Sequence, residues 1–96
     1  MAAVLILAAT TGAAASKGAV ALTRRHVSFF AVPALVAAET AALEVTPDNG
    51  QTWVSTPQQL SATTTLIAAI VPGTYRVNKG ASVTATAIYA ATEENF

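Results

Sequence analysis

The side chains that could do chemistry are few in this 96-residue chain, and they are scattered along it. His26 is the only histidine and the chain has no cysteine, so no part of the sequence groups the ligands of a metal site or the members of a catalytic triad. The carboxylates are Glu39, Glu44, Asp48, Glu93 and Glu94. Glycosidase chemistry needs two carboxylates roughly 5–10 Å apart in a cleft, and this spacing indicates no such pair. We therefore predict a protein that is not an enzyme and that uses no metal or cofactor.

The charge of the chain argues against nucleic acid as a partner. Five Lys+Arg balance five Asp+Glu, and the one basic cluster is Arg24-Arg25 beside His26. A nucleic-acid-binding domain needs a basic surface. Only 10% of the residues are charged and 53% are hydrophobic, whereas a free-standing small domain carries about 25–35% charged residues on its surface. We expect part of the surface to lie against other protein; the alternative is a monomer coated with Thr, Ser and Ala.

Residues 1–9, MAAVLILAA, form an uncharged apolar run. A secretory signal needs Lys or Arg before such a run, and a membrane-spanning helix takes about 20 apolar residues. This run meets neither requirement, so we predict no membrane association and expect a buried or edge strand. The lack of cysteine favours folding in a reducing compartment, such as a bacterial cytosol.

The spacing of apolar runs and turn residues predicts an all-β protein. Thr and Val are abundant, and their branched side chains favour strands. Short apolar runs alternate with turn signals every 8–12 residues or so, which is typical of a sandwich or barrel. We expect about eight short antiparallel strands in one two-sheet sandwich domain, residues 1–96, of the Ig-like or jelly-roll kind. The predicted strand segments are residues 3–10, 19–23, 26–32, 40–46, 51–55, 59–62, 64–71, 73–78 and 81–91.

Residues 46–53, TPDNGQTW, predict a tight structural hairpin. Asp48 can accept hydrogen bonds from backbone N–H groups two residues further on. Asn49 and Gly50 tolerate the positive φ that a tight hairpin needs. Trp53 would then pin the returning strand onto the core. In residues 40–46 the alternation predicts Ala41, Leu43 and Val45 on one face and Ala42, Glu44 and Thr46 on the other.

The same stretch resembles the Asp-box hairpin of sialidases, Ser/Thr-x-Asp-x-Gly-x-Thr-Trp. In those enzymes the hairpin is structural and is repeated over several propeller blades. This chain has one copy and is long enough for about two blades, so a closed propeller cannot form from it. The resemblance therefore supports the hairpin and not a sugar-cleaving activity.

A wider resemblance covers residues 43–92. The segments LEVTPDNGQTWV, VPGTYRVNKG and ASVTATAIYAAT resemble small β-sandwich virion proteins of tailed bacteriophages, of the kind that decorate or cement a capsid. The resemblance implies a structural protein that binds the major capsid protein and stabilises the assembled head shell. It also implies a homo-oligomer, with a trimer as the expected form, on the capsid surface of a virion assembled in the cytoplasm of a host bacterium. Many weak contacts, multiplied by avidity, would hold it there.

The contact residues of such an assembly are predicted from two apolar segments that we expect to be exposed, residues 2–9 and 33–38. Four consecutive apolar residues imply burial on both faces of a strand, and an outer strand of a small sandwich has only one buried face within its own chain. We therefore predict inter-subunit contacts at Val4, Leu5, Ile6, Leu7, Leu35 and Val36.

Two alternatives remain open. One is an Ig-like or carbohydrate-binding module of a phage fibre or adhesin, which exposed aromatic residues around Trp53 and Tyr75 would favour. The other is a tail or neck component of the virion. The aromatic residues Phe29, Phe30, Tyr75 and Tyr89 could form a ligand platform, although the core or a subunit contact is the favoured interpretation.

Overall fold

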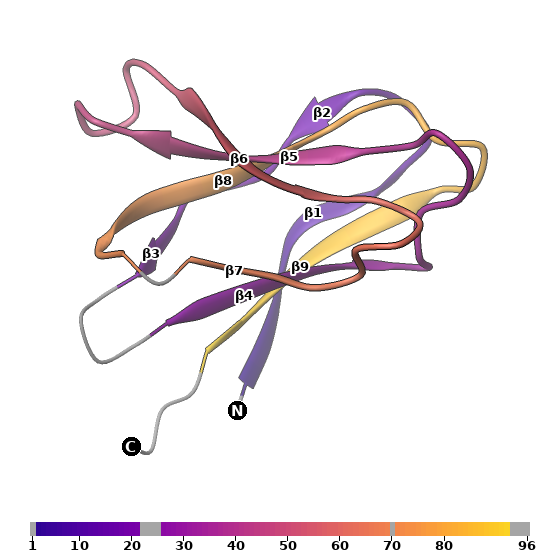
Figure 1. Cartoon of the computed structure of the whole chain (residues 1–96), viewed down its shortest axis with the longest axis horizontal. Coiled ribbons are helices and arrows are strands. Elements are labelled where there is room, and N and C mark those ends of the chain that lie inside the picture. The colour runs from indigo at the N-terminus through magenta and orange to yellow at the C-terminus, as the bar shows by residue number, and fades with distance from the viewer. Residues whose placement is uncertain (1, 22–25, 70, 93–96) are drawn as a thin grey trace.

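The computed structural model describes residues 2–21, 26–69 and 71–92, which form nine strands in two sheets packed face to face (Figure 1). The strands are β1 (Ala2–Thr10), β2 (Ala14–Ala15), β3 (Ala19–Ala21), β4 (Val27–Val32), β5 (Ala41–Thr46), β6 (Val54–Leu60), β7 (Ile67–Ala69), β8 (Gly73–Lys79) and β9 (Thr86–Thr92). This confirms the predicted fold class, an antiparallel two-sheet β-sandwich.

The two sheets are built from segments that alternate along the chain. One has the order β1-β9-β4-β7 and occupies the lower half of Figure 1. The other has the order β2-β8-β5-β6, with β3 also paired to β8. The chain passes from one sheet to the other between β1 and β2, β3 and β4, β4 and β5, β6 and β7, β7 and β8, and β8 and β9. Neither sheet can therefore form until residues far apart in the sequence have come together.

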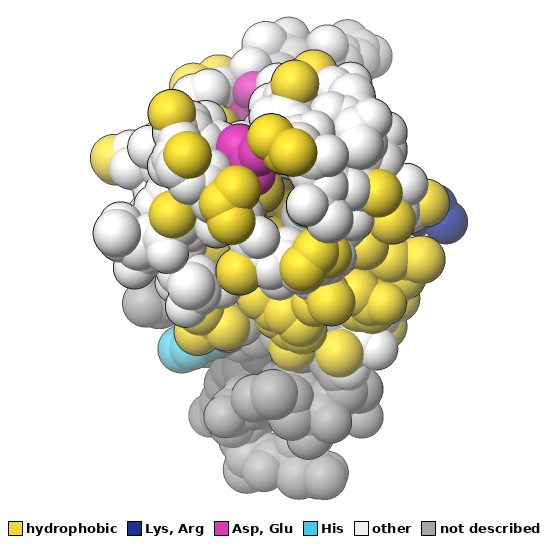
Figure 2. All heavy atoms as spheres, turned by 90° about the vertical axis from the view of Figure 1, so that its right-hand side faces the viewer, with side chains coloured by type: hydrophobic (Ala, Val, Ile, Leu, Met, Phe, Trp, Pro, Cys, Tyr) yellow, Lys and Arg dark blue, Asp and Glu magenta, His cyan; other side chains and the backbone are white. Residues whose placement is uncertain are grey.

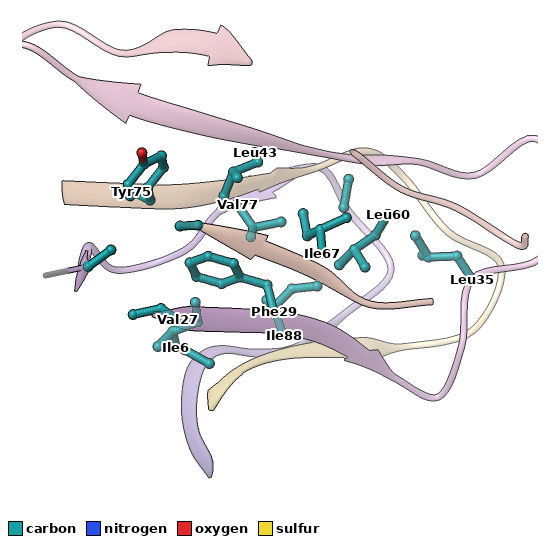
Figure 3. Close-up of a cluster of buried hydrophobic side chains, with 14 residues drawn as sticks. Ile6, Val27, Phe29, Leu35, Leu43, Leu60, Ile67, Tyr75, Val77 and Ile88 are labelled. Atoms are coloured by element: carbon teal, nitrogen blue, oxygen red, sulfur yellow. The ribbon is translucent and has the colours of Figure 1, made fainter. Parts of the chain in front are cut away.

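The core lies between the sheets, where one row of side chains from each strand meets the row from the opposite sheet (Figure 3). Phe29 on β4 and Ile88 on β9 point toward Leu43 on β5 and Val77 on β8, and all four are fully buried. On β5 the predicted alternation is correct: Ala41 and Leu43 are buried in the core and Val45 packs against it. The period of two in the sequence thus places one face of each strand inside.

The largest error of the sequence prediction concerns Pro57. We predicted separate strands over 51–55 and 59–62 on either side of it, but β6 runs through it from Val54 to Leu60. Proline is tolerated there because β6 is the edge of its sheet, where a missing N–H removes no ladder hydrogen bond. The pairing with β5 also shifts register beside it, between Ala42 and Glu44.

Smaller differences follow from the tertiary pairing. The segment 12–18, which lies between the predicted strands 3–10 and 19–23, contains the short strand β2, which pairs with Asn78 and Lys79 on β8. The strand predicted over 81–91 begins at Thr86, and the strand predicted over 64–71 contributes only Ile67–Ala69 to β7. Arg24, Arg25, Glu93 and Glu94 lie outside the described residues.

The apolar run in β1 is accommodated by a bulge. Leu5 pairs with Tyr89 and Leu7 pairs with Ile88, so Ile6 is an extra residue on β1. Ile6 is buried in the core and Leu7 packs against it, while Val4 and Leu5 are 60% and 45% exposed. Two consecutive residues can therefore face the core of a single chain. The prediction that all four side chains reach a neighbouring subunit is wrong for Ile6, because the bulge turns it inward.

Phe29 and Phe30 provide a test of the layer between the sheets, because they are adjacent on β4 but face opposite sides. Phe29 is fully buried, so Phe29→Ala should lower the free energy of unfolding by about 3–5 kcal/mol. Phe30 is only partly buried and stacks on Tyr89, so Phe30→Ala should cost about 1–2 kcal/mol. Urea unfolding of the two variants measures both values, and equal losses would contradict the assignment of faces.

Candidate functional site

The hairpin at residues 46–52 is closed by a network of side-chain hydrogen bonds. The Thr46 hydroxyl accepts from the Gly50 N–H (2.7 Å) and donates to Asp48 Oδ1 (3.1 Å). Asp48 Oδ1 also accepts from the Thr52 N–H (2.6 Å), four residues on rather than the two that we predicted. Asn49 and Gly50 have φ values of 60° and 93°, as a tight hairpin needs. Asp48 is thus engaged within its own turn.

Trp53 lies on the outer face of the five-stranded sheet and not on the core. The guanidinium carbon of Arg76 lies 4.5 Å from the centre of the Trp53 ring. Arg76 Nε also donates to Glu44 Oε1 at 2.7 Å, and Asn78 donates to Glu44 Oε2 at 3.4 Å. The sequence missed this cluster because the register that sets Glu44 opposite Arg76 is a tertiary property. Arg76 thus connects Trp53, which follows the hairpin, to Glu44 on β5 by stacking on one and pairing with the other.

The aromatic residues divide between the core and the two outer faces. Phe29 and Tyr75 are buried, and the Tyr75 hydroxyl donates to the Val71 carbonyl oxygen at 2.8 Å. Tyr75 therefore cannot join Trp53 in an exposed aromatic surface of the kind that would favour the carbohydrate-binding alternative. Phe30 and Tyr89 stack with ring centres 5.6 Å apart and planes 11° apart, on the outer face of the four-stranded sheet.

This outer face carries several apolar side chains that the core of the chain does not bury. One row of side chains crosses the sheet in register: Leu5 on β1, Tyr89 on β9 and Phe30 on β4. Val32 follows Phe30 on the same side of β4, and Leu66 precedes β7; they are 47% and 58% exposed. We call these five residues, Leu5, Phe30, Val32, Leu66 and Tyr89, the apolar face.

The two outer faces differ in chemistry. The outer side of the five-stranded sheet carries Glu44, Arg76 and Asn78, including the Glu44–Arg76 ion pair. The strands of the four-stranded sheet carry no charged side chain. In Figure 2, which views one end of the sandwich, hydrophobic side chains gather in the lower half, where Figure 1 places that sheet. An uncharged apolar surface of this kind is typical of a site that binds other protein.

The predicted contact residues are found in two environments. Val4, Leu5 and Val36 are exposed, so they remain available for contact. Leu35 is buried in the core beside Leu60, so its assignment as a surface contact is wrong. The prediction rested on the apolar composition of residues 33–38. Composition does not show that the Leu35 side chain points into the core while the Val36 side chain points into solvent.

Two charged side chains fasten the loops at one end of the sandwich. Lys79 is almost fully buried, and its ammonium group donates to the carbonyl oxygens of Gly12 (3.2 Å) and Gly80 (2.9 Å). The Glu39 carboxylate accepts from the backbone N–H groups of Val83 (2.7 Å) and Val36 (3.0 Å), which lowers the pKa of Glu39. The Glu39 contacts join the loops 33–40 and 80–85, and the Lys79 contacts join Gly12 to Gly80.

His26 is exposed just before β4. Among the described residues, no group of three or more His, Cys, Asp or Glu side chains could hold a metal ion. A search of the same residues for an apolar helix of membrane-spanning length found none.

The comparisons with known proteins found no match to this chain among family models, curated proteins or solved structures.

The Asp48 network predicts a specific effect of acid. Hydrogen bonds from the side chain and backbone of Thr52 lower the pKa of Asp48, so the ionised carboxylate stabilises the fold. That stabilisation is present above the unfolded pKa of Asp48 and is lost as the pH falls through the lower folded value. Asp48→Asn should therefore lower the midpoint of thermal unfolding at neutral pH, and the difference from wild type should shrink in acid. A difference that stays constant with pH would show that ionisation of Asp48 does not matter.

The position of Trp53 changes the expected effect of its removal. Truncation of a buried ring would lower the free energy of unfolding by about 3–5 kcal/mol. Because Trp53 is half-buried on an outer face and stacked under Arg76, we expect Trp53→Ala to cost about 1–2 kcal/mol. Trp53→Phe keeps an aromatic face for Arg76 and should cost less. Urea unfolding measures both, and a loss from Trp53→Ala as large as that from Phe29→Ala would contradict this assignment.

Proposed function

We propose that this chain is a structural virion protein, a decoration protein that binds and stabilises the assembled head shell of a tailed bacteriophage. The observation that supports the proposal most directly is the apolar face on the four-stranded sheet. In its row Leu5–Tyr89–Phe30, the Leu5 side chain is exposed and the two aromatic rings are partly buried. None of the three side chains is charged. Burying it against the major capsid protein would remove apolar surface from water.

The arrangement of the sandwich suits such a role. A sheet is a rigid platform, so its outer face can dock with little loss of conformational freedom. The opposite outer face, with Glu44, Arg76 and Asn78, is polar and would face water on the surface of the particle. A decoration protein needs this two-sided character because it must attach by one side and remain soluble on the other.

The carbohydrate-binding alternative has less support. Among the residues that the structure describes, Trp53 is the one aromatic ring on the polar face near suitable hydrogen-bonding groups, and Arg76 stacks on it. Tyr75, the second aromatic residue whose exposure would favour this alternative, is buried. A tail or neck component differs from a head decoration protein only in the surface that the apolar face would contact.

Binding to particles tests the proposal. Particles from a strain that lacks the gene are mixed with purified protein and sedimented, and heads and tails are analysed separately. We expect the protein to sediment with heads. Protein that stays in the supernatant would contradict a virion role, and protein that sediments only with tails would support the tail alternative.

A matched pair of variants then tests the docking surface. Val32 on the apolar face and Val54 on the five-stranded sheet are 47% and 51% exposed. Val32→Lys places a charge on the proposed contact and should weaken binding to heads by about tenfold or more. Val54→Lys introduces the same change elsewhere and should bind as wild type. Equal binding by the two variants would exclude the apolar face as the contact.

A further inference from the structure

The edge of β1 is open over its first half. β1 is the outermost strand of its sheet, and its residues 2–5 pair regularly with β9 on one side. In the part of the chain that the structure describes, no strand pairs with the other side of this segment. A strand edge presents unpaired backbone N–H and C=O groups, which are a template for another strand.

The second half of β1 is closed. The carbonyl oxygen of Ile6 accepts a hydrogen bond from the Lys17 N–H at 2.9 Å, so the chain that follows β2 covers the edge there. The register of β1 shifts between Leu5 and Leu7 and again between Leu7 and Thr10. Bulges of this kind disrupt pairing with another strand. The open edge is therefore confined to residues 2–5.

The other sheet edges carry features that oppose pairing. β6 contains Pro57, which has no N–H to donate. β7 has three residues, and the carbonyl oxygen of its middle residue, Ala68, already accepts from the Gln58 side chain at 3.1 Å. β2 and β3 have two and three residues. Residues 2–5 are regular, uncharged and free of proline, so they lack each of these protections.

We propose that residues 2–5 of β1 pair antiparallel with the same residues of a second copy of this chain, so that two four-stranded sheets become one continuous sheet. The segment suits a copy of itself for two reasons. It has no charge that a two-fold axis would set against itself, and the whole chain has a net charge of zero, so two copies do not repel. The exposed side chains of Val4 and Leu5 would be covered at the same time.

The symmetry of the pair has a structural consequence. A two-fold axis that relates antiparallel strands of one sheet is perpendicular to that sheet, so it keeps each residue on its original face. The apolar faces of the two copies would therefore lie on the same side, with Leu5 of each copy near the axis. One residue near the middle of the segment, Ala3 or Val4, would lie directly opposite itself. The pairing does not rest on the proposed function, but it would give any docking partner two apolar faces in one surface.

Charge complementarity across the axis provides the main test. Sedimentation of wild type at micromolar concentration should show a species of twice 9.7 kDa. Val4→Lys and Val4→Glu should each weaken the dimer by about tenfold or more, because like charges face each other within roughly 5–8 Å. An equimolar mixture of the two variants should dimerise again. Val83→Lys, in a loop far along the chain and 85% exposed, should dimerise as wild type.

Single cysteines provide a second readout that does not depend on charge. The chain has no cysteine, so a disulfide can form only between two copies. Under mild oxidation Ala3→Cys or Val4→Cys should be cross-linked, whichever lies on the axis, and Val83→Cys should not. A monomer in solution, a trimer, a mixture of charge variants that fails to recover, or equal cross-linking at position 83 would overturn the proposal. A dimer that does not bind phage particles would leave this pairing intact and refute the proposed function alone.

Discussion

The contact between the two sheets, made by a single layer of apolar side chains, is the interaction on which the rest of the structure depends. The chain has no disulfide, so this layer and the strand pairing must hold it together. Phe29 and Ile88 from one sheet meet Leu43 and Val77 from the other. Each strand gives alternate side chains to the layer, and this alternation fixes which residues remain for the outer faces.

The outer faces have different characters because different residues alternate with the core positions. On β8, Arg76 lies between the buried residues Tyr75 and Val77, and it pairs with Glu44 of β5. On β4, Phe30 follows the buried Phe29 and stacks on Tyr89 of β9. The polar face is thus satisfied within the chain by an ion pair and stacking, whereas the apolar face leaves hydrophobic surface in water. That difference supports docking through the four-stranded sheet.

β1 combines two roles within nine residues because its bulge changes the direction of its side chains. At the bulge, Ile6 and Leu7 contribute to the core, and the Lys17 N–H covers the edge at Ile6. Before the bulge, residues 2–5 keep a regular edge with Val4 and Leu5 exposed. A strand without the bulge would have placed alternate residues of the apolar run on opposite faces, and Ile6 and Leu7 could not both have reached the core.

The sequence by itself determined the features that depend on near neighbours. The turn at Asp48–Gly50 follows from residues that tolerate positive φ, and the alternation along β5 follows from the period of a strand; both were predicted. Tertiary structure decided the rest: that Pro57 lies within an edge strand, that Leu35 is buried, and that Trp53 stacks on Arg76 rather than on the core. Each of these depends on which strands become neighbours and in what register. Such pairings join residues distant in the sequence, and no local pattern of residue types specifies them.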